Sequence, residues 1–188
     1  MKLGIRIIIG LLAAGWGADL AAAPPDYKLW LPHRQAQRAG WEWAAIGEMA
    51  LLQVNGNSPT QCKLVEQVFN APAGTCCKTP PQKNCTQPGH FPQLDALWIL
   101  QGRVPLPVEE LPSAEELYAY LRMEQVLVVE VSGPQKLTRL LTLKAMRYRP
   151  SPQGETAILT LHDPALANAV EMPYRVFAQA WLQGMLLQ

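Results

Sequence analysis

Apolar residues recur at helical spacing through the first two thirds of the chain and at strand spacing after Met123. Positions three or four residues apart predict helices over residues 41–54, 60–69, 91–102 and 113–122. The first of these helices is apolar on nearly every side, which is typical of a helix buried in the middle of a domain. Asn55-Gly56-Asn57 is expected to end it. Ser113 with Glu116 three residues later has the pattern of a capping box for the fourth helix.

The second part of the chain has the pattern of a sheet. Residues 126–131, 137–148 and 156–161 are rich in β-branched and apolar residues and are separated by short turns. Consecutive strands joined in this way predict an antiparallel meander. A last helix is expected over residues 174–187, with Phe177 and Trp181 one turn apart. The chain is therefore predicted to be α+β, with an N-terminal helical half followed by an antiparallel sheet.

Two irregular stretches complete this picture. Residues 26–38 have the alternation of an extended segment, which Pro32 interrupts. Residues 70–89 are rich in Pro, Gly, Thr and Cys and have no periodicity, so they form a long loop. A loop of this length needs links that pin it to the rest of the fold.

The cysteines can supply those links, since all of them lie in one short segment: Cys62, Cys76, Cys77 and Cys85. In an exported protein they meet an oxidising compartment, so we expect two disulfide bonds. A bond between the neighbours Cys76 and Cys77 would strain the peptide between them. Cys62 is then joined to one of that pair and Cys85 to the other. A zinc site is the alternative, although adjacent cysteines lack the usual ligand spacing.

Export is predicted by the N-terminus, which has the form of a secretory signal peptide. Basic residues precede an apolar run over residues 7–14, and Ala21-Ala22-Ala23 offers a small-residue cleavage site. We expect a signal peptide over residues 1–23, a single domain over residues 24–188, and a periplasmic or secreted mature protein without a stable membrane span. A retained anchor is the alternative, but a transmembrane helix needs about 20 apolar residues and this run is shorter.

The charges give little support for a nucleic-acid partner. The formal net charge is +1, and the basic residues are scattered along the chain. A nucleic-acid-binding domain would carry a clustered basic excess. We therefore expect no nucleic-acid partner, and we expect no cofactor and no metal.

Four short motifs follow one another along the chain: Gly40-Trp41-Glu42-Trp43-Ala44-Ala45 at a helix start, Thr60-Gln61-Cys62, Cys76-Cys77, and Asp163-Pro164 at a strand end. In this order they resemble a bacterial family of papain-like cysteine peptidases, which includes plant-pathogen effector proteases and lies near the bacteriocin-processing peptidases. The resemblance covers almost the whole mature chain. It implies the papain-like cysteine peptidase fold.

The resemblance also assigns positions in a former active site. Trp43-Ala44-Ala45 matches the residues after the nucleophile, so Glu42 stands where the family has cysteine. Arg139 stands where the family has histidine in the best strand register, with Lys136 or Thr138 if the register slips. The remaining matches are Asp163 for the orienting residue and Gln37, or less well Gln35, for the oxyanion-hole glutamine. Trp41 and Trp43 flank the groove position, and any exposed face of theirs is expected to bind a partner.

These replacements remove the chemistry of a cysteine peptidase. Acyl transfer needs a thiolate, formed at a helix N-terminus beside an imidazolium. Glu42 keeps a negative charge at the helix start but lacks the thiolate's nucleophilicity. Arg139 keeps a positive charge but cannot release a proton near neutral pH. An ion pair between Glu42 and Arg139 would preserve the electrostatics of the site without its reaction, so no catalytic residue is expected.

Plainer interpretations of the same residues remain open. Glu42 is also what the first turn of any helix favours, and Arg139 would face solvent if the strand register moved by one residue. His162 and Asp163 look like a catalytic dyad, but successive strand residues point to opposite faces. His33 precedes the first helix and His90 lies in the cysteine-rich loop, and either could approach the groove in the fold.

Three functions are therefore weighed. The first is a catalytically inactive pseudopeptidase that binds a protein or peptide partner in the cell envelope. The second is a hydrolase of changed chemistry with Glu42 as general base, although an adjacent arginine would favour the charged form of Glu42. The third is a purely structural subunit of an envelope assembly. An open groove is expected of a binding protein, and a filled one of a structural subunit.

Overall fold

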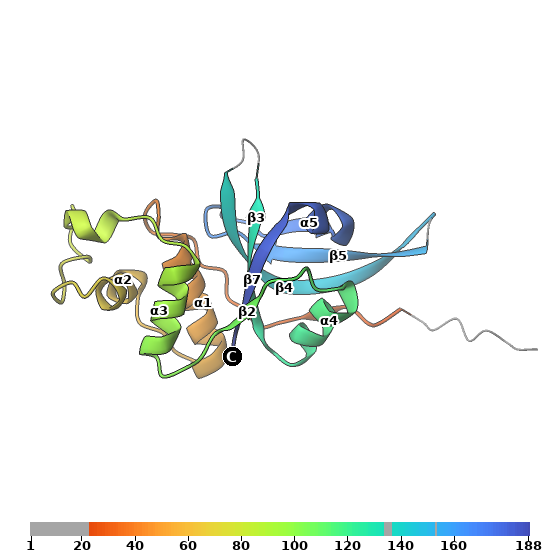
Figure 1. The fold of residues 1–188 in the computed structure, drawn as a ribbon, viewed down its shortest axis with the longest axis horizontal. Coiled ribbons are helices and arrows are strands. Elements are labelled where there is room, and N and C mark those ends of the chain that lie inside the picture. The colour runs from red at the N-terminus through yellow and green to blue at the C-terminus, as the bar shows by residue number, and fades with distance from the viewer. Residues whose placement is uncertain (1–22, 134–136, 153) are drawn as a thin grey trace, which may run out of the picture.

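The computed structural model describes residues 23–133, 137–152 and 154–188. The predicted signal peptide therefore lies outside the described residues except for its last position, and Lys136 also lies outside them. Three helices, α1 (Glu42–Asn55), α2 (Gln61–Val68) and α3 (Phe91–Leu100), lie together at one end of the molecule (Figure 1). The sheet occupies the other end, with helices α4 (Ala114–Arg122) and α5 (Tyr174–Ala180) packed against it.

The α1 helix is the centre of the helical half, because it contacts α2 and α3 and also the strands β3 (Val126–Ser132) and β4 (Thr138–Ser151). Most of its residues are buried, as the all-round apolar pattern predicts. It ends at Gly56, whose φ of 72° and hydrogen bond to the Leu52 carbonyl form a left-handed cap. Both the burial and the end of this helix were predicted correctly.

The α4 helix begins with the predicted capping box. The Ser113 hydroxyl accepts a hydrogen bond from the Glu116 amide at 3.2 Å, and the Ser113 amide donates to the Glu116 carboxylate at 2.7 Å. Each of these two backbone amides thus donates a hydrogen bond to a side-chain oxygen. A short 3-10 turn, η1 (Lys83–Thr86), lies in the long loop before α3.

The strands form one antiparallel sheet in the order β2-β7-β3-β4-β5-β6, with β1 paired to β4. The strands of the predicted meander are present as β3 (Val126–Ser132), β4 (Thr138–Ser151) and β5 (Gly154–His162). The short strands are β1 (Tyr27–Lys28), β2 (Leu106–Val108) and β6 (Val170–Pro173). The α+β class with an antiparallel sheet is therefore confirmed.

Strand β4 organises the sheet because it is long enough to pair with several neighbours. Its first half pairs with β3, and β1 pairs with its second half at Ala145 and Met146. Strand β5 follows its opposite edge, and the register shifts between Leu143 and Ala145. Arg139 lies near the start of β4, in the half that pairs with β3, and both strands contact α1.

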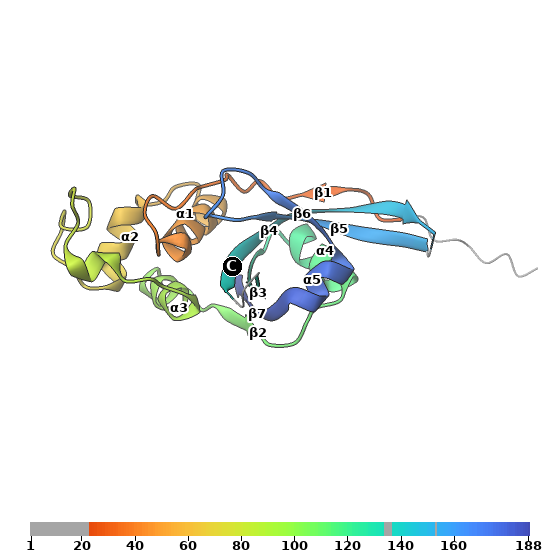
Figure 2. The same ribbon diagram turned by 90° about the horizontal axis from the view of Figure 1, so that it is seen from above.

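The last helix of the sequence prediction is wrong in its second half. The chain is helical only over α5 and then continues as strand β7 (Trp181–Leu187), which lies between β2 and β3. Met185, Leu186 and Leu187 are buried in this sheet. A short apolar run can form either a helix or a strand. Here it forms a strand, because β2 and β3 each have an edge with which it can pair. Figure 2 shows β7 beside β2 and β3.

Candidate functional site

A cavity of about 130 Å³ lies where the helical half meets the sheet. Glu42 at the start of α1 forms one wall, and Gly89 and His90 before α3 form another. Residues 138–140 of β4 and the segment after β5, with Asp163 and Ala165, complete the lining. His90 and Thr138 are exposed, so the cavity opens to solvent at their side.

The chain enters α1 through a tight turn that fixes Glu42. The Trp41 amide donates to the Arg38 carbonyl at 3.1 Å, and Gly40 has a φ of 83° that favours glycine. A Cβ atom on Gly40 would also lie 2.9 Å from the Pro88 backbone, so the two loops approach too closely for a side chain. Glu42 is half-buried in the first turn, where the helix dipole stabilises its negative charge.

The segment before this turn is held by Gln61, for which the sequence predicted no role beyond its place in the Thr60-Gln61-Cys62 motif. Its side chain is 1% exposed. It accepts a hydrogen bond from the Gln37 amide at 2.9 Å and donates to the Gln35 carbonyl at 2.9 Å and to Glu48 at 3.0 Å. A buried amide with this many partners fixes the local backbone. The Gln61 position within the Thr60-Gln61-Cys62 motif was the available signal.

Gln37 and Gln35 take part through their backbone atoms. Both side chains are exposed, and neither is part of the cavity lining. The geometry therefore gives no support for the oxyanion-type position predicted for Gln37. The backbone of the 35–37 segment is instead used to anchor the chain to α2.

Arg139 and Asp163 meet in the cavity as an ion pair. Asp163 is almost fully buried, and its Oδ1 accepts a hydrogen bond from the Ala165 amide at 2.8 Å. Its Oδ2 faces Nη2 of Arg139, whose side chain is 37% exposed. The pairing in the sheet places Arg139 opposite Val131. Arg139 thus faces the cavity and Asp163, and Thr138, the residue of the alternative register, lines the same cavity.

The predicted ion pair between Glu42 and Arg139 is not formed. Both residues line the same cavity, but the carboxylate that pairs with Arg139 is Asp163. Among the described residues, none lies within ion-pair distance of Glu42. The physical reason is burial, because an unpaired carboxylate costs far more at Asp163 than at the half-buried Glu42.

Of the three histidines, His90 is the one that lines the cavity. Its Nδ1 lies 3.9 Å from a carboxylate oxygen of Glu130 on β3, whose other oxygen accepts a hydrogen bond from Gln183 on β7. Its backbone amide donates to the Gln93 side chain at 2.7 Å, which fixes His90 at the start of α3. His90 could be noted in the sequence, but the sequence could not predict that it lies in the same cavity as Glu42, because its position depends on the path of the long loop.

His162 and Asp163 do not act as a dyad. His162 is 2% exposed and packs edge-on against His33, with their ring centres 4.6 Å apart. Burial lowers the pKa of His162 to about 3, and the positive charge of Lys144 and the neighbouring His33 and Lys28 add to the effect. The two neighbours therefore have different surroundings: His162 is the last residue of β5 and packs against His33, whereas Asp163 follows the strand and pairs with Arg139.

The groove residues predicted from the sequence are in the core. Trp41 and Trp43 are fully buried, so the prediction that they line a binding groove is wrong. The Trp41 indole donates to the Cys85 carbonyl at 2.8 Å. A Cβ atom on Gly89 would lie 2.4 Å from the Trp43 ring. Both rings are covered by the long loop, which the local sequence could not reveal.

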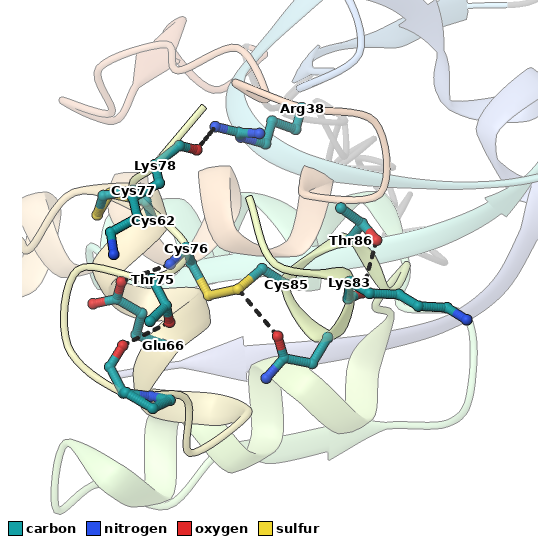
Figure 3. The surroundings of a disulfide bond; sticks show 12 residues. Arg38, Cys62, Glu66, Thr75, Cys76, Cys77, Lys78, Lys83, Cys85 and Thr86 are labelled. Atoms are coloured by element: carbon teal, nitrogen blue, oxygen red, sulfur yellow. Dashed lines mark hydrogen bonds between the residues drawn. A yellow bond between two sulfur atoms is a disulfide. The ribbon is translucent and has the colours of Figure 1, made fainter. Parts of the chain in front are cut away.

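That loop is pinned by two disulfides, Cys62–Cys77 and Cys76–Cys85. This pairing confirms the expected bonds and excludes four free thiolates as zinc ligands. Figure 3 shows the Cys76 amide, which donates to the buried Glu66 carboxylate at 2.8 Å, and Arg38, which donates to the Lys78 carbonyl at 2.8 Å. The Cys62–Cys77 disulfide thus connects the loop to α2, and hydrogen bonds from Arg38 and Trp41 connect the loop to the turn before Glu42. Both disulfides fit a protein of an oxidising compartment.

The chemistry open to this cavity follows from its side chains. Every cysteine of the chain is in a disulfide, so no thiolate is present at the helix start. Arg139 cannot transfer protons near neutral pH. Within the described part of the chain, no group of three or more His, Cys, Asp or Glu side chains is arranged to hold a metal ion. The cavity offers a carboxylate, an imidazole and a neutralised arginine.

Comparison with known proteins adds no family assignment: no protein-family model matches the chain, and no curated protein is significantly similar to it. In the described ranges, which begin at residue 23, every helix is too short or too polar to cross a membrane.

Proposed function

We propose that the chain is an exported, catalytically inactive homologue of papain-like peptidases that binds a protein or peptide partner in the cell envelope. The observation that carries the proposal is that Glu42, Arg139 and Asp163 line one cavity. These are the positions to which the resemblance assigns the nucleophile, the base and the orienting residue. Their types preserve charge and hydrogen bonding but cannot perform thiol acyl transfer.

The open cavity favours a binding protein over a purely structural subunit. A structural subunit would have this space filled by its own side chains or by the N-terminal segment. Residues 23–36 do not belong to the cavity lining in the described structure. The disulfides and the N-terminal sequence pattern both support a periplasmic or secreted location.

A second candidate is a hydrolase that uses Glu42 as a general base. The observation in its favour is His90, an imidazole that lines the same cavity and has a carboxylate, Glu130, near its Nδ1. Such a His–carboxylate arrangement is common where protons are transferred. The described cavity has no hydroxyl or thiol nucleophile beside His90 other than Thr138, which lies on the exposed rim.

One experiment separates the two candidates. The mature protein with intact disulfides is incubated with a diverse peptide mixture, and products are identified by mass spectrometry. The same protein is then used to capture peptides from the mixture at equilibrium. We expect captured peptides and no cleavage. Cleavage that disappears in Glu42→Gln or His90→Gln would contradict the proposal and establish the hydrolase, whereas the absence of any captured peptide would remove the binding function.

A further inference from the structure

The charges of the cavity do not cancel. Arg139 is neutralised by Asp163, and His90 faces Glu130, so each group able to carry a positive charge already has a carboxylate beside it. Glu42 has no such partner among the described residues. The N-terminus of α1 offsets roughly half a unit charge. The cavity therefore keeps a negative excess in either protonation state of His90.

This negative excess determines whether a bound ligand would be an anion or a cation. An arginine in a former active site invites the idea of a carboxylate ligand, but Asp163 already neutralises the charge of Arg139. A second carboxylate would also meet the charge of Glu42. A cation would instead be attracted by an unpaired carboxylate. This attraction is strongest where the surroundings are partly shielded from water. Glu42 is half-buried, which satisfies that condition.

The volume and the lining of the cavity limit which cations could bind there. A volume of about 130 Å³ is below the roughly 300 Å³ at which pockets begin to hold a whole small-molecule ligand. It fits one terminal group of a larger partner. One unpaired carboxylate is too few oxygens for a calcium or magnesium ion. Leu140 and Ala165 provide apolar wall against which an aliphatic stem can lie while its charged end reaches Glu42.

From this geometry we propose that the cavity binds a primary ammonium group of the partner peptide, with Glu42 as its counter-ion. The group is either a lysine side chain or the free α-amino group of a chain N-terminus, because both present the same compact cation. This inference rests on the proposed peptide-binding function and adds to it the chemistry that is recognised. The replacement of cysteine by glutamate is then a change from attack on a peptide bond to recognition of a charge.

The test is an NMR titration of the ¹⁵N-labelled mature protein with its disulfides intact. N-acetyl-lysine methylamide carries only the side-chain ammonium, and alanyl-alanine amide carries only the terminal one. N-acetyl-glutamate methylamide and Nε-acetylated N-acetyl-lysine methylamide are the controls. We expect an ammonium probe to shift the amide resonances of Glu42, Gly89, His90 and Ala165, with weaker binding at high salt. The probe that binds more tightly identifies the source of the ammonium.

A pair of variants assigns the effect to Glu42. Glu42→Gln is expected to weaken binding about five- to tenfold, as the loss of one partly screened charge pair. Glu110→Gln removes a carboxylate from an exposed loop outside the cavity and is expected to leave binding unchanged. Equal binding of the acetylated lysine probe by the unaltered protein would overturn the inference even if Glu42→Gln failed to fold. So would undiminished binding by a folded Glu42→Gln variant, or the absence of shifts with both ammonium probes.

The outcomes also separate this inference from the proposed function. Capture of peptides without preference for lysine or a free N-terminus would overturn the ammonium site and leave the peptide-binding function intact. Peptide cleavage, or no peptide capture at all, would overturn the proposed function itself.

Discussion

Arg139 and Arg147 lie on the same strand and are almost equally exposed, at 37% and 36%. Their partners differ, because Asp163 is 2% exposed in its side chain and Glu171 is 50% exposed. The value of an ion pair depends on whether the remaining charge can return to water when its partner is removed. The two arginines are therefore a matched pair for measuring what the cavity requires.

We expect Arg139→Ala to lower the free energy of unfolding by about 2–3 kcal/mol, somewhat less than for a fully buried pair, because it leaves Asp163 buried without a counter-ion. Arg147→Ala is expected to change it by less than about 1 kcal/mol, since its pair is exposed. Denaturant unfolding at neutral pH measures both values. Equal effects of the two substitutions would show that Asp163 does not depend on Arg139.

His162 makes the fold sensitive to acid. Its pKa is about 3 in the folded protein against an ordinary value of 6.5, because burial and the nearby Lys144, His33 and Lys28 disfavour the charged form. The unfolded chain then binds the proton more readily, so this stability is present above pH 6.5 and is lost as the pH falls toward 3.

His162→Gln should remove that part of the acid sensitivity. Between pH 7 and pH 4.5 we expect the unaltered protein to lose about 2–3 kcal/mol more than the variant, at about 1.4 kcal/mol per pH unit. Urea unfolding at the two pH values gives the difference directly. The same loss in both proteins would mean that His162 is not the group that titrates. The comparison between proteins cancels the contribution of the carboxylates.

At the scale of elements, α1 is the part whose start defines the cavity. The tight turn at Gly40 and the clamp formed by Gln61 hold residue 42 at the first helical position. A helix start lowers the pKa of a thiol placed there, because the dipole favours the thiolate. The start of the helix therefore stabilises the negative charge of Glu42, and it should equally stabilise the thiolate of a cysteine placed at position 42.

We expect Glu42→Cys to react with iodoacetamide at pH 6 several-fold faster than Glu110→Cys, an exposed position on a loop. Adding Arg139→His places an imidazole beside Asp163 and should raise the rate further. The rate is measured by mass spectrometry with both disulfides intact. A thiol at position 42 that reacts no faster than the one at position 110 would show that the helix start is not electropositive. Little peptide hydrolysis is expected, because Gln37 is not part of the cavity lining.

At the scale of the whole molecule, the disulfide-pinned loop joins the helical half to the cavity. Cys62–Cys77 ties the loop to α2, whereas Cys76–Cys85 fixes the segment that leads to Gly89 and His90. The Trp41 indole bonds to Cys85, and the Gly89 amide donates to the Gly40 carbonyl at 3.2 Å. The second disulfide therefore supports one wall of the cavity and the turn beside it.

Removal of either disulfide as a pair of Cys→Ala substitutions is expected to cost about 2–4 kcal/mol of stability. The two variants should differ at the cavity. Loss of Cys76–Cys85 should speed hydrogen exchange at the Gly89 amide, and loss of Cys62–Cys77 should leave it protected, because the wall is held by the former. Similar exchange at Gly89 in both variants would show that the wall is held by other contacts.

Local pattern was enough to determine the first four helices, the central strands and the α+β class, because these depend on periodicity, capping and turns that lie within a few residues. The candidate positions Glu42, Arg139 and Asp163 could also be found in the sequence, and the structure brings all of them to one cavity. The disulfide partners were reduced to two pairings by the adjacency of Cys76 and Cys77, and the fold selected one.

Tertiary structure decided everything that depends on distant partners. Strand β7 forms because β2 and β3 offer it a place between them, and Gly184, a weak helix former, lies within the predicted helix. Trp41 and Trp43 are covered by a loop some forty residues away in sequence, at Cys85 and Gly89. Arg139 pairs with Asp163 because burial makes that carboxylate the more costly one to leave alone. Glu42 is left as the charge that the cavity presents.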